Sequence, residues 1–556
     1  MKFCDMPYER VDFDRVDEEL TGLIRELEAA KSGEEQFAVH QRFYKLTDHV
    51  QTLMTIGEVR HDINTVDEFY EKERKYYDEM RPVYQNKVLE YMQKLYASPY
   101  REYLERKIGP VAFKNMEVAM KAFDERVITL SQEENALVME YDQLIAGAKI
   151  PFDGKELNLS LLQPYLVNAD REIRRQAWQK MTDFFLENAE QLDTIYDKLV
   201  KNRTAQAKAM GYENYLELGY YRMGRNCYGQ KEVESFRRQI KEYFVPFAEK
   251  LHERRRQRLG LEKLSYIDKD VYFPQGNPAP TGTPEEILEA GGRMYRELSP
   301  ETGEFFDFML ENQLFDVLGR KNKRAGGYMT YMPDYQSPFI FANFNGTSAD
   351  VDVITHECGH AFQGYLSGKD PIREHADIGM ETAEIHSMSM EFITEQWMDL
   401  FFGDRKQDYI DMHLEDSAIF IPYGCMVDEF QHIVYEHPEM TPAQRHAAWL
   451  KLEKEYRPHM DYEDNPFFGK GGFWQKQLHI YTSPLYYIDY CLAQTCALQY
   501  KIWKDENFEE AWASYLKLCR LSASDFYTNM IPAVGLECPF EEGSIRHLVE
   551  KLEKAI

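Results

Sequence analysis

The strongest chemical signal in the sequence is a pair of histidines four residues apart, His356 and His360, with Glu357 next to the first of them. On a helix, residues i and i+4 share one face, so both imidazoles can reach a single ion. Neutral imidazoles suit Zn²⁺, which lowers the pKa of a coordinated water towards about 7. Glu357 is placed to take the proton of such a water as it attacks a carbonyl. The pattern therefore predicts metal-assisted hydrolysis, and the alternative is two surface histidines on an ordinary helix.

A catalytic zinc needs a third protein ligand and one open position. Residues 379–391 predict a second helix that carries several acids and one histidine. Glu381 and Glu384 share a face of this helix, so spacing alone does not separate them as the third ligand. His386 is a weaker candidate. A carboxylate from this helix would complete a His₂Glu set, which is typical of zinc hydrolases.

The histidine pair must be held by a helix that follows a small sheet. The aromatic-rich segments 327–332 and 338–344 flank a Pro-Asp turn and predict an antiparallel pair of strands. Thr347 or Ser348 can cap the helix that comes next. Asp352, one turn before the first histidine and on the same face, either supports a ligand or interacts with the helix dipole.

Most of the remaining sequence has helical periodicity. Residues 14–33 carry apolar side chains at helical spacing, and Gly33 is expected to end that helix. Similar patterns cover 71–95 and 114–145, and the Asp-Gly pair within 150–155 favours a turn or hairpin. The predicted fold class is predominantly α with a small antiparallel β-sheet in the middle.

Composition limits the partners. The 66 Lys+Arg against 95 Asp+Glu give a net charge of −29, which disfavours nucleic acids and anionic membrane surfaces. No apolar stretch is long enough for a membrane helix or a secretory signal. The 8 cysteines form no CxxC pair, which is typical of reduced thiols. We expect a cytoplasmic protein without nucleic-acid or membrane partners; its oligomeric state is not indicated.

Segment 356–360 (HECGH), followed by 383–391 (AEIHSMSME), resembles the M3 family of zinc metallopeptidases, and most of all its oligoendopeptidase F and Pz-peptidase branch. In that family the second helix carries two glutamates seven residues apart, and the first binds zinc. Glu384 and Glu391 have this separation. The resemblance therefore implies one zinc per chain, held by the two histidines and Glu384, with Glu391 steadying a ligand.

The resemblance extends to the C-terminal third of the chain. It implies that His479, Tyr487 and Tyr490 donate hydrogen bonds to the negative oxygen that develops during hydrolysis. The register of this segment is open by one residue, which makes Tyr486 the alternative to Tyr487. The glycine-rich segment 469–472 is either a lid over the site or an ordinary connection.

The same resemblance implies a two-lobed helical ellipsoid around a deep channel, with a zincin-type catalytic core. Residues 1–160 would form an N-terminal helical region in the channel wall, and residues 161–556 the catalytic domain. The expected activity is that of a zinc endopeptidase acting on short unfolded peptides. Segment 338–344 is expected to offer its edge to the peptide backbone as an added strand, with Asn343 helping to hold the register.

Two other functions remain open. A carboxypeptidase or dipeptidyl carboxypeptidase could share this helix, but it needs a cation for the terminal carboxylate of the substrate, and Arg373 is more typical of a solvated surface. A helical peptide-binding scaffold with a structural zinc is a second alternative. Structural zinc sites are usually closed by Cys and His, and Cys358 points away from the histidine face.

Overall fold

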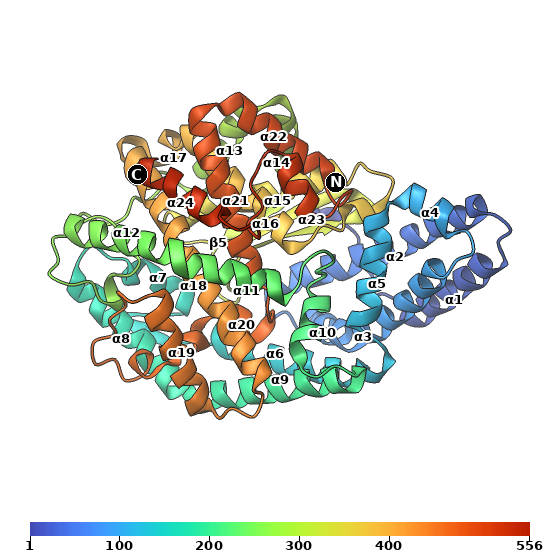
Figure 1. The fold of residues 1–556 in the computed structure, drawn as a ribbon, viewed down its shortest axis with the longest axis horizontal. Coiled ribbons are helices and arrows are strands. Elements are labelled where there is room, and N and C mark those ends of the chain that lie inside the picture. Colours follow the sequence, from blue (N-terminus) through green and yellow to red (C-terminus); the bar gives the residue numbers. More distant parts are fainter. Residues whose placement is uncertain (556) are drawn as a thin grey trace.

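The computed structural model describes residues 1–555 and is predominantly helical, as predicted (Figure 1). The N-terminal helices lie together at one end of the molecule and have a hydrophobic cluster of their own, drawn from residues between Val11 and Met116. These helices are α1 (Phe13–Ala29), α2 (Gly33–Ile63), α3 (Glu68–Tyr96), α4 (Arg101–Ile108) and α5 (Pro110–Ala122). The next helix, α6 (Ile128–Ala146), packs into the main hydrophobic core through Tyr141.

The apolar spacing predicted the buried face of α1 correctly but not its end. Val16, Leu20 and Leu27 are buried, and the Asp12 carboxylate accepts a hydrogen bond from the backbone N–H of Arg15 at the N-cap. Gly33 does not stop this helix, because α1 already ends at Ala29 and Gly33 is the first residue of α2. The segment predicted as one helix over 114–145 is likewise divided between α5 and α6.

The Asp-Gly hairpin is confirmed. Strands β1 (Ile150–Phe152) and β2 (Lys155–Leu157) are antiparallel. Asp153 and Gly154 have φ of 51° and 69°, as a tight two-residue hairpin turn requires. The helices that follow are α7 (Leu159–Leu166), α8 (Arg171–Glu187), α9 (Ala189–Met210), α10 (Tyr215–Arg222), α11 (Gln230–Gln239), α12 (Val245–Arg258), α13 (Pro284–Leu298) and α14 (Pro300–Glu311).

The central sheet has the order β3-β5-β4. Its strands are β3 (Phe315–Leu318), β4 (Tyr328–Met332) and β5 (Ser337–Phe344). The predicted pair, β4 and β5, is antiparallel, whereas β3 pairs parallel to β5 and was not predicted, because four residues are too few to establish an alternating pattern. β5 is therefore paired on both sides. The prediction that segment 338–344 offers its edge to a peptide is wrong, because the strands with an unpaired edge are the two outer ones, β3 and β4.

The histidine pair lies on α15, directly after β5. Ser348 is its N-cap but makes no side-chain cap bond; instead, the carboxylate of Asp350 accepts hydrogen bonds from the backbone N–H groups of Asn345 and Gly346, each at 2.8 Å. The predicted side-chain cap is thus wrong. From here the helices are α15 (Ala349–Ser367), α16 (Met380–Ile393), α17 (Asp399–Phe402), α18 (Lys406–Glu436), α19 (Pro442–Tyr456), α20 (Leu478–Thr482), α21 (Tyr487–Glu506), α22 (Phe508–Leu521), α23 (Tyr527–Ala533) and α24 (Ser544–Ala555).

The helices of the described residues differ from membrane-spanning segments in length or apolar character. Within residues 1–555, none of them combines the length and the apolar character needed to cross a bilayer.

Candidate metal centre and active site

Two helices that cross closely carry the candidate ligands. α15 bears the two histidines and α16 bears Glu384. At the crossing point, a Cβ added to Gly359 would lie 2.5 Å from the carbonyl oxygen of His386. Only glycine permits this approach of the two backbones. The glycine inside the HECGH segment therefore sets the separation between the histidines and the acid that faces them.

The three predicted ligands meet at one point. The Oε2 atom of Glu384 lies 3.3 Å from Nε2 of His356 and 3.4 Å from Nε2 of His360. One donor atom from each residue lies within 4.8 Å of the others. Two imidazole nitrogens and one carboxylate oxygen that converge in this way fit a zinc ion with a fourth position left for another ligand.

The other two candidates for the third ligand lie elsewhere. Glu381 accepts a hydrogen bond from the hydroxyl of Tyr228 at 3.4 Å, and burial raises the pKa of its carboxyl to about 7. His386 is fully buried, and burial lowers its pKa to about 3. Of the three candidates on this helix, only Glu384 faces the histidine pair.

A second carboxylate holds the first histidine in place. Nδ1 of His356 lies 2.6 Å from Oε1 of Glu391, the contact that the resemblance predicted. Asp352, the other candidate for this task, instead accepts a hydrogen bond from the hydroxyl of Tyr409 at 2.6 Å. Burial raises the pKa of the Asp352 carboxyl to about 7. A carboxylate on Nδ1 fixes the tautomer that leaves Nε2 free to bind a metal.

Glu357 is buried and lies beside the start of β4. A Cβ placed on Gly327, the residue before this strand, would be 3.8 Å from Oε1 of Glu357. Asn343, which was expected to hold the substrate, has another task. Its side-chain amide donates to the carbonyl oxygens of Arg324 and Gly326, both at 2.8 Å, and so fixes the loop that leads into β4.

His479 is held as a neutral hydrogen-bond donor. The amide of Gln477 donates to its Nδ1 at 2.9 Å, while the carbonyl oxygen of that amide accepts from the hydroxyl of Tyr423 at 2.8 Å. Because Nδ1 is the acceptor, the proton is on Nε2, which lies 3.4 Å from the hydroxyl of Tyr490. Burial lowers the pKa of His479 to about 4. Neither Gln477 nor Tyr423 was predicted from the sequence.

The tyrosine register differs by one residue from the prediction. The hydroxyl of Tyr486 donates to Oε1 of Glu384. The ring of Tyr487 is buried in the hydrophobic core, where it packs edge-on against Tyr423 and His479, with Phe420 beside it. The tyrosine beside the candidate ligands is therefore Tyr486, because α21 begins at Tyr487 and turns its first side chain inward.

The glycine-rich segment is packed. Gly471 has a φ of 91°, and a Cβ there would lie 2.3 Å from the carbonyl oxygen of His446. Its own carbonyl oxygen lies 3.1 Å from Nδ1 of His446. This segment is a close-packed connection, and its geometry does not favour the lid interpretation.

Comparison with known proteins agrees with this architecture. Residues 3–123 match the Peptidase M3 N-terminal domain, and residues 165–279 and 302–550 match Peptidase family M3. The chain belongs to peptidase family M3. It is 22% identical over 452 residues to the group B oligopeptidase PepB of Streptococcus agalactiae, covering 75% of this chain and 72% of that protein. It is 21% identical over 459 residues to an oligoendopeptidase F homolog of Borreliella burgdorferi, covering 77% of this chain and 75% of that one.

Solved structures show the same relationship. PZ peptidase A, determined with an inhibitor, superposes on this M3 peptidase with a TM-score of 0.98 at 44% identity, covering 100% of this chain and 99% of that one. Oligoendopeptidase F from Enterococcus faecium shares the fold, with a TM-score of 0.59 at 16% identity over 98% of this chain and 97% of that one. The protein is a peptidase with the fold of these enzymes.

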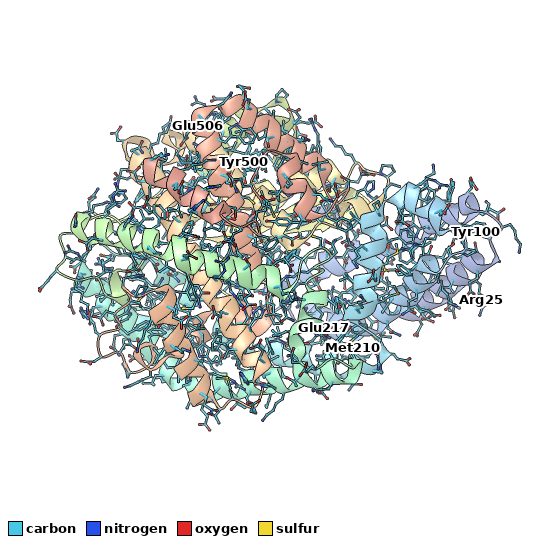
Figure 2. All side chains as sticks on the ribbon, viewed as in Figure 1. Arg25, Tyr100, Met210, Glu217, Tyr500 and Glu506 are labelled. Carbon is cyan, nitrogen blue, oxygen red and sulfur yellow. The ribbon has the colours of Figure 1, made fainter. Side chains whose placement is uncertain are left out.

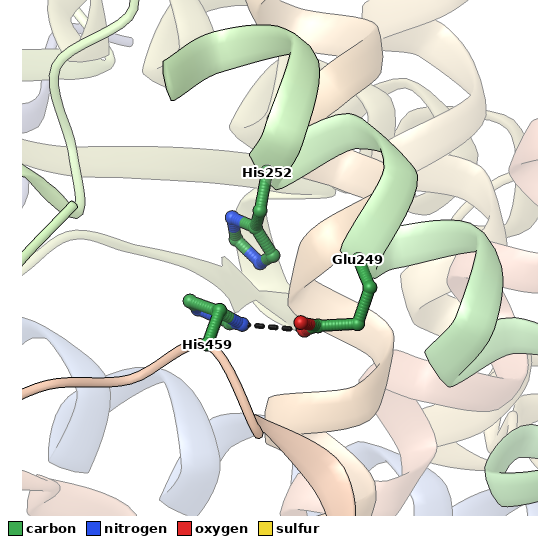
Figure 3. A group of neighbouring side chains, drawn as sticks. All are labelled: Glu249, His252 and His459. Carbon is green, nitrogen blue, oxygen red and sulfur yellow. Dashed lines mark hydrogen bonds and ion pairs between the residues drawn. The ribbon is translucent and has the colours of Figure 1, made fainter. Parts of the chain in front are cut away.

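A second group of potential ligands in this M3 peptidase lies away from the first: Glu249 and His252 on α12, and His459 after α19 (Figure 3). Nδ1 of His459 lies 2.6 Å from Oε1 of Glu249. The Arg255 guanidinium donates to Nδ1 of His252 at 3.0 Å, so the proton of that imidazole is on Nε2. Because Nδ1 of His252 accepts this hydrogen bond and the Arg255 guanidinium lies beside it, the group does not offer a metal ion three free ligand atoms. We assign it a structural role, which ties α12 to the segment after α19.

Proposed function

We propose that this M3 peptidase is a zinc-dependent endopeptidase that hydrolyses internal bonds of short unfolded peptides. The observation that carries the proposal is the convergence of His356, His360 and Glu384 on one point, with Glu357 beside a strand whose edge is unpaired. One zinc ion per chain would be held by the three converging side chains. Bound there, zinc supplies a Lewis acid that polarises a peptide carbonyl.

The protein's own residues move the protons. Glu357 accepts a proton from the attacking water and passes it to the leaving amine. His479, through its Nε2–H, and the hydroxyl of Tyr490 donate hydrogen bonds to the oxygen that becomes negative. The hydroxyl of Tyr486 donates to Oε1 of Glu384 in the structure, and it would become a third donor by turning from that carboxylate to the same oxygen. Gln477 keeps His479 in the tautomer that can donate.

The substrate would bind along β4. A peptide backbone that pairs with this strand as an added strand passes directly beside Glu357. The first residues of β4, Tyr328 to Thr330, line a cavity of about 440 Å³ shared with α2. A neighbouring cavity of about 680 Å³ extends between α3, α6 and the loop before β4, and both are lined by Asp62 and Arg324. These cavities would accommodate peptide residues beyond the cleaved bond.

The exopeptidase alternative needs an unpaired cation near the site. Arg373 is engaged with Asp48 at 2.8 Å, and Arg324 is paired with Asp62 at 3.2 Å and with Asp142 at 3.4 Å. With both guanidinium groups already neutralised, an endopeptidase is the better interpretation. We also propose a cytoplasmic location, since all eight cysteines are free thiols.

An internally quenched peptide that is blocked at both ends tests the proposal. We expect the purified protein to contain one zinc per chain, to cleave this peptide, and to lose activity when a chelator removes the metal. Cleavage that required a free C-terminus would instead establish the exopeptidase alternative. Full activity in protein shown to be free of metal would refute the zinc mechanism.

The tyrosine register can be tested with two neighbouring variants. Tyr486→Phe removes the hydroxyl beside Glu384, and we expect kcat to fall about 10²-fold or more while KM changes little, because this donor acts on developing charge. Tyr487→Phe is the matched control, since its ring packs in the core, and kcat should stay near that of the wild type. If steady-state kinetics instead showed a large loss of kcat in Tyr487→Phe and none in Tyr486→Phe, Tyr487 would be the hydrogen-bond donor, as first predicted.

A further inference from the structure

Glu391 bridges two imidazoles. Its Oε1 lies 2.6 Å from Nδ1 of His356, and its Oε2 lies 2.6 Å from Nε2 of His413 on α18. Both bonds are short, as expected when a carboxylate is one of the partners. The orientation of Glu391, and through it that of His356, therefore depends on a residue that does not contact the candidate metal position.

His413 is itself braced by charges further from the site. Its Nδ1 lies 3.8 Å from Oε1 of Glu395, four residues after Glu391 in the 3₁₀ turn Thr394–Trp397 that follows α16. The other oxygen of Glu395 is paired with Lys504 at 2.6 Å and with Lys501 at 3.4 Å. Tyr500 and Glu506, labelled in Figure 2, mark the part of α21 that carries these lysines. From Glu391 outward the charges alternate in sign, through His413 and Glu395 to the two lysines, so each of the two buried carboxylates has a cation beside it.

The ring of His413 has little freedom to turn. Tyr409 lies parallel to it, with centroids 5.7 Å apart and planes 6° apart, and Phe392 packs against it at 4.6 Å. Tyr409 is in turn fixed by its hydrogen bond to Asp352. Contacts with Glu391 and Glu395 raise the pKa of His413 to about 10 against the opposing effect of burial. Of the two ring nitrogens, Nε2 donates a hydrogen bond to Glu391, whereas Nδ1 lies 3.8 Å from Oε1 of Glu395 in an ion-pair contact without a hydrogen bond.

We propose that His413 is a positioning residue of the metal centre, which holds Glu391 in the orientation that aims Nε2 of His356 at the ion. This inference rests on the proposed zinc site. Without His413, the Oε2 atom of Glu391 loses its partner, the carboxylate can rotate, and the ligand imidazole is no longer fixed. Loss of a partner at this distance from a metal typically weakens metal binding about 10–100-fold.

The test compares zinc affinities, measured by competition with a chromophoric chelator, in variants of the full-length protein. We expect His413→Leu to bind zinc about 10–100-fold more weakly than the wild type. His413→Gln, whose side-chain amide can still donate to Glu391, should recover most of the loss. His432→Leu is the matched control: His432 lies on the same helix, is also buried, and contacts Tyr220 and Arg237 instead. It should bind zinc like the wild type.

Kinetics give a second readout. In zinc-saturated His413→Leu we expect a lower kcat with little change in KM, because substrate contacts are untouched. Wild-type zinc affinity in a folded His413→Leu protein would overturn the inference, and so would an equal loss in His432→Leu. If His413→Leu does not fold, the zinc affinities of two other variants test the inference. We expect His413→Gln to bind zinc about as tightly as the wild type and Glu395→Gln to bind it more weakly. Wild-type zinc affinity in Glu395→Gln would overturn the inference. Failure of the wild type to bind zinc would instead refute the proposed function.

Discussion

Replacing Glu357 by glutamine is expected to slow peptide hydrolysis by about 10²–10⁴-fold, the usual contribution of a group that transfers a proton in the rate-limiting step. Glutamine has nearly the same shape but cannot accept a proton. Glu357 is buried beside β4 and does not belong to the converging group of His356, His360 and Glu384, so metal binding should persist. The measurement is kcat/KM on the blocked, quenched peptide.

Zinc content is the control for this variant. We expect Glu357→Gln to retain one zinc per chain, which separates loss of proton transfer from loss of the metal. Wild-type hydrolysis by the variant would refute the role of Glu357 as general base. Loss of zinc together with activity would instead make Glu357 a ligand.

Removal of Glu384 should have the other large effect. Glu384→Ala leaves two imidazoles without the acid that faces them at 3.3 and 3.4 Å. We expect zinc affinity to fall more than about 100-fold, beyond the 10–100-fold typical of residues that only support a ligand. Hydrolysis at low free zinc should fall with it. Chelator competition gives the affinity, and the same quenched peptide gives the activity.

Glu381→Ala is the matched control for this variant. Glu381 is equally buried on the same helix, three residues earlier, but contacts Tyr228. We expect the Glu381→Ala variant to have a lower free energy of unfolding but the zinc affinity of the wild type. If Glu381→Ala lost zinc and Glu384→Ala kept it, the assignment of the third ligand would be reversed.

Local patterns predicted most of the fold. The helices follow from apolar spacing that buries one face, as in α1, and the β4–β5 pair follows from two aromatic runs around a turn. Strand β3 could not be predicted, because its four residues gain their structure from pairing with β5. Its parallel pairing removes the free edge of β5 and leaves β3 and β4 as the edge strands of the sheet.

The candidate site was predictable where one helix carries the signal. His356 and His360 share a face by spacing alone, whereas the choice of Glu384 over Glu381 required the family resemblance. The partners from distant segments were not predicted. His413 lies 22 residues beyond Glu391 on another helix, and nothing in its neighbourhood marks it. Tyr487 was misplaced because a one-residue shift at a helix start cannot be seen in a run of aromatic residues.

The position of β4 has a consequence for solubility as well as for binding. An unpaired strand edge on a protein surface invites pairing with other chains and promotes aggregation. Here the edge strand lies alongside α2, and the two enclose a cavity. Covering an edge strand with a helix is one of the ways in which proteins limit such pairing. The strand proposed to bind the peptide is therefore less open to pairing with strands of other folded molecules than a bare edge would be.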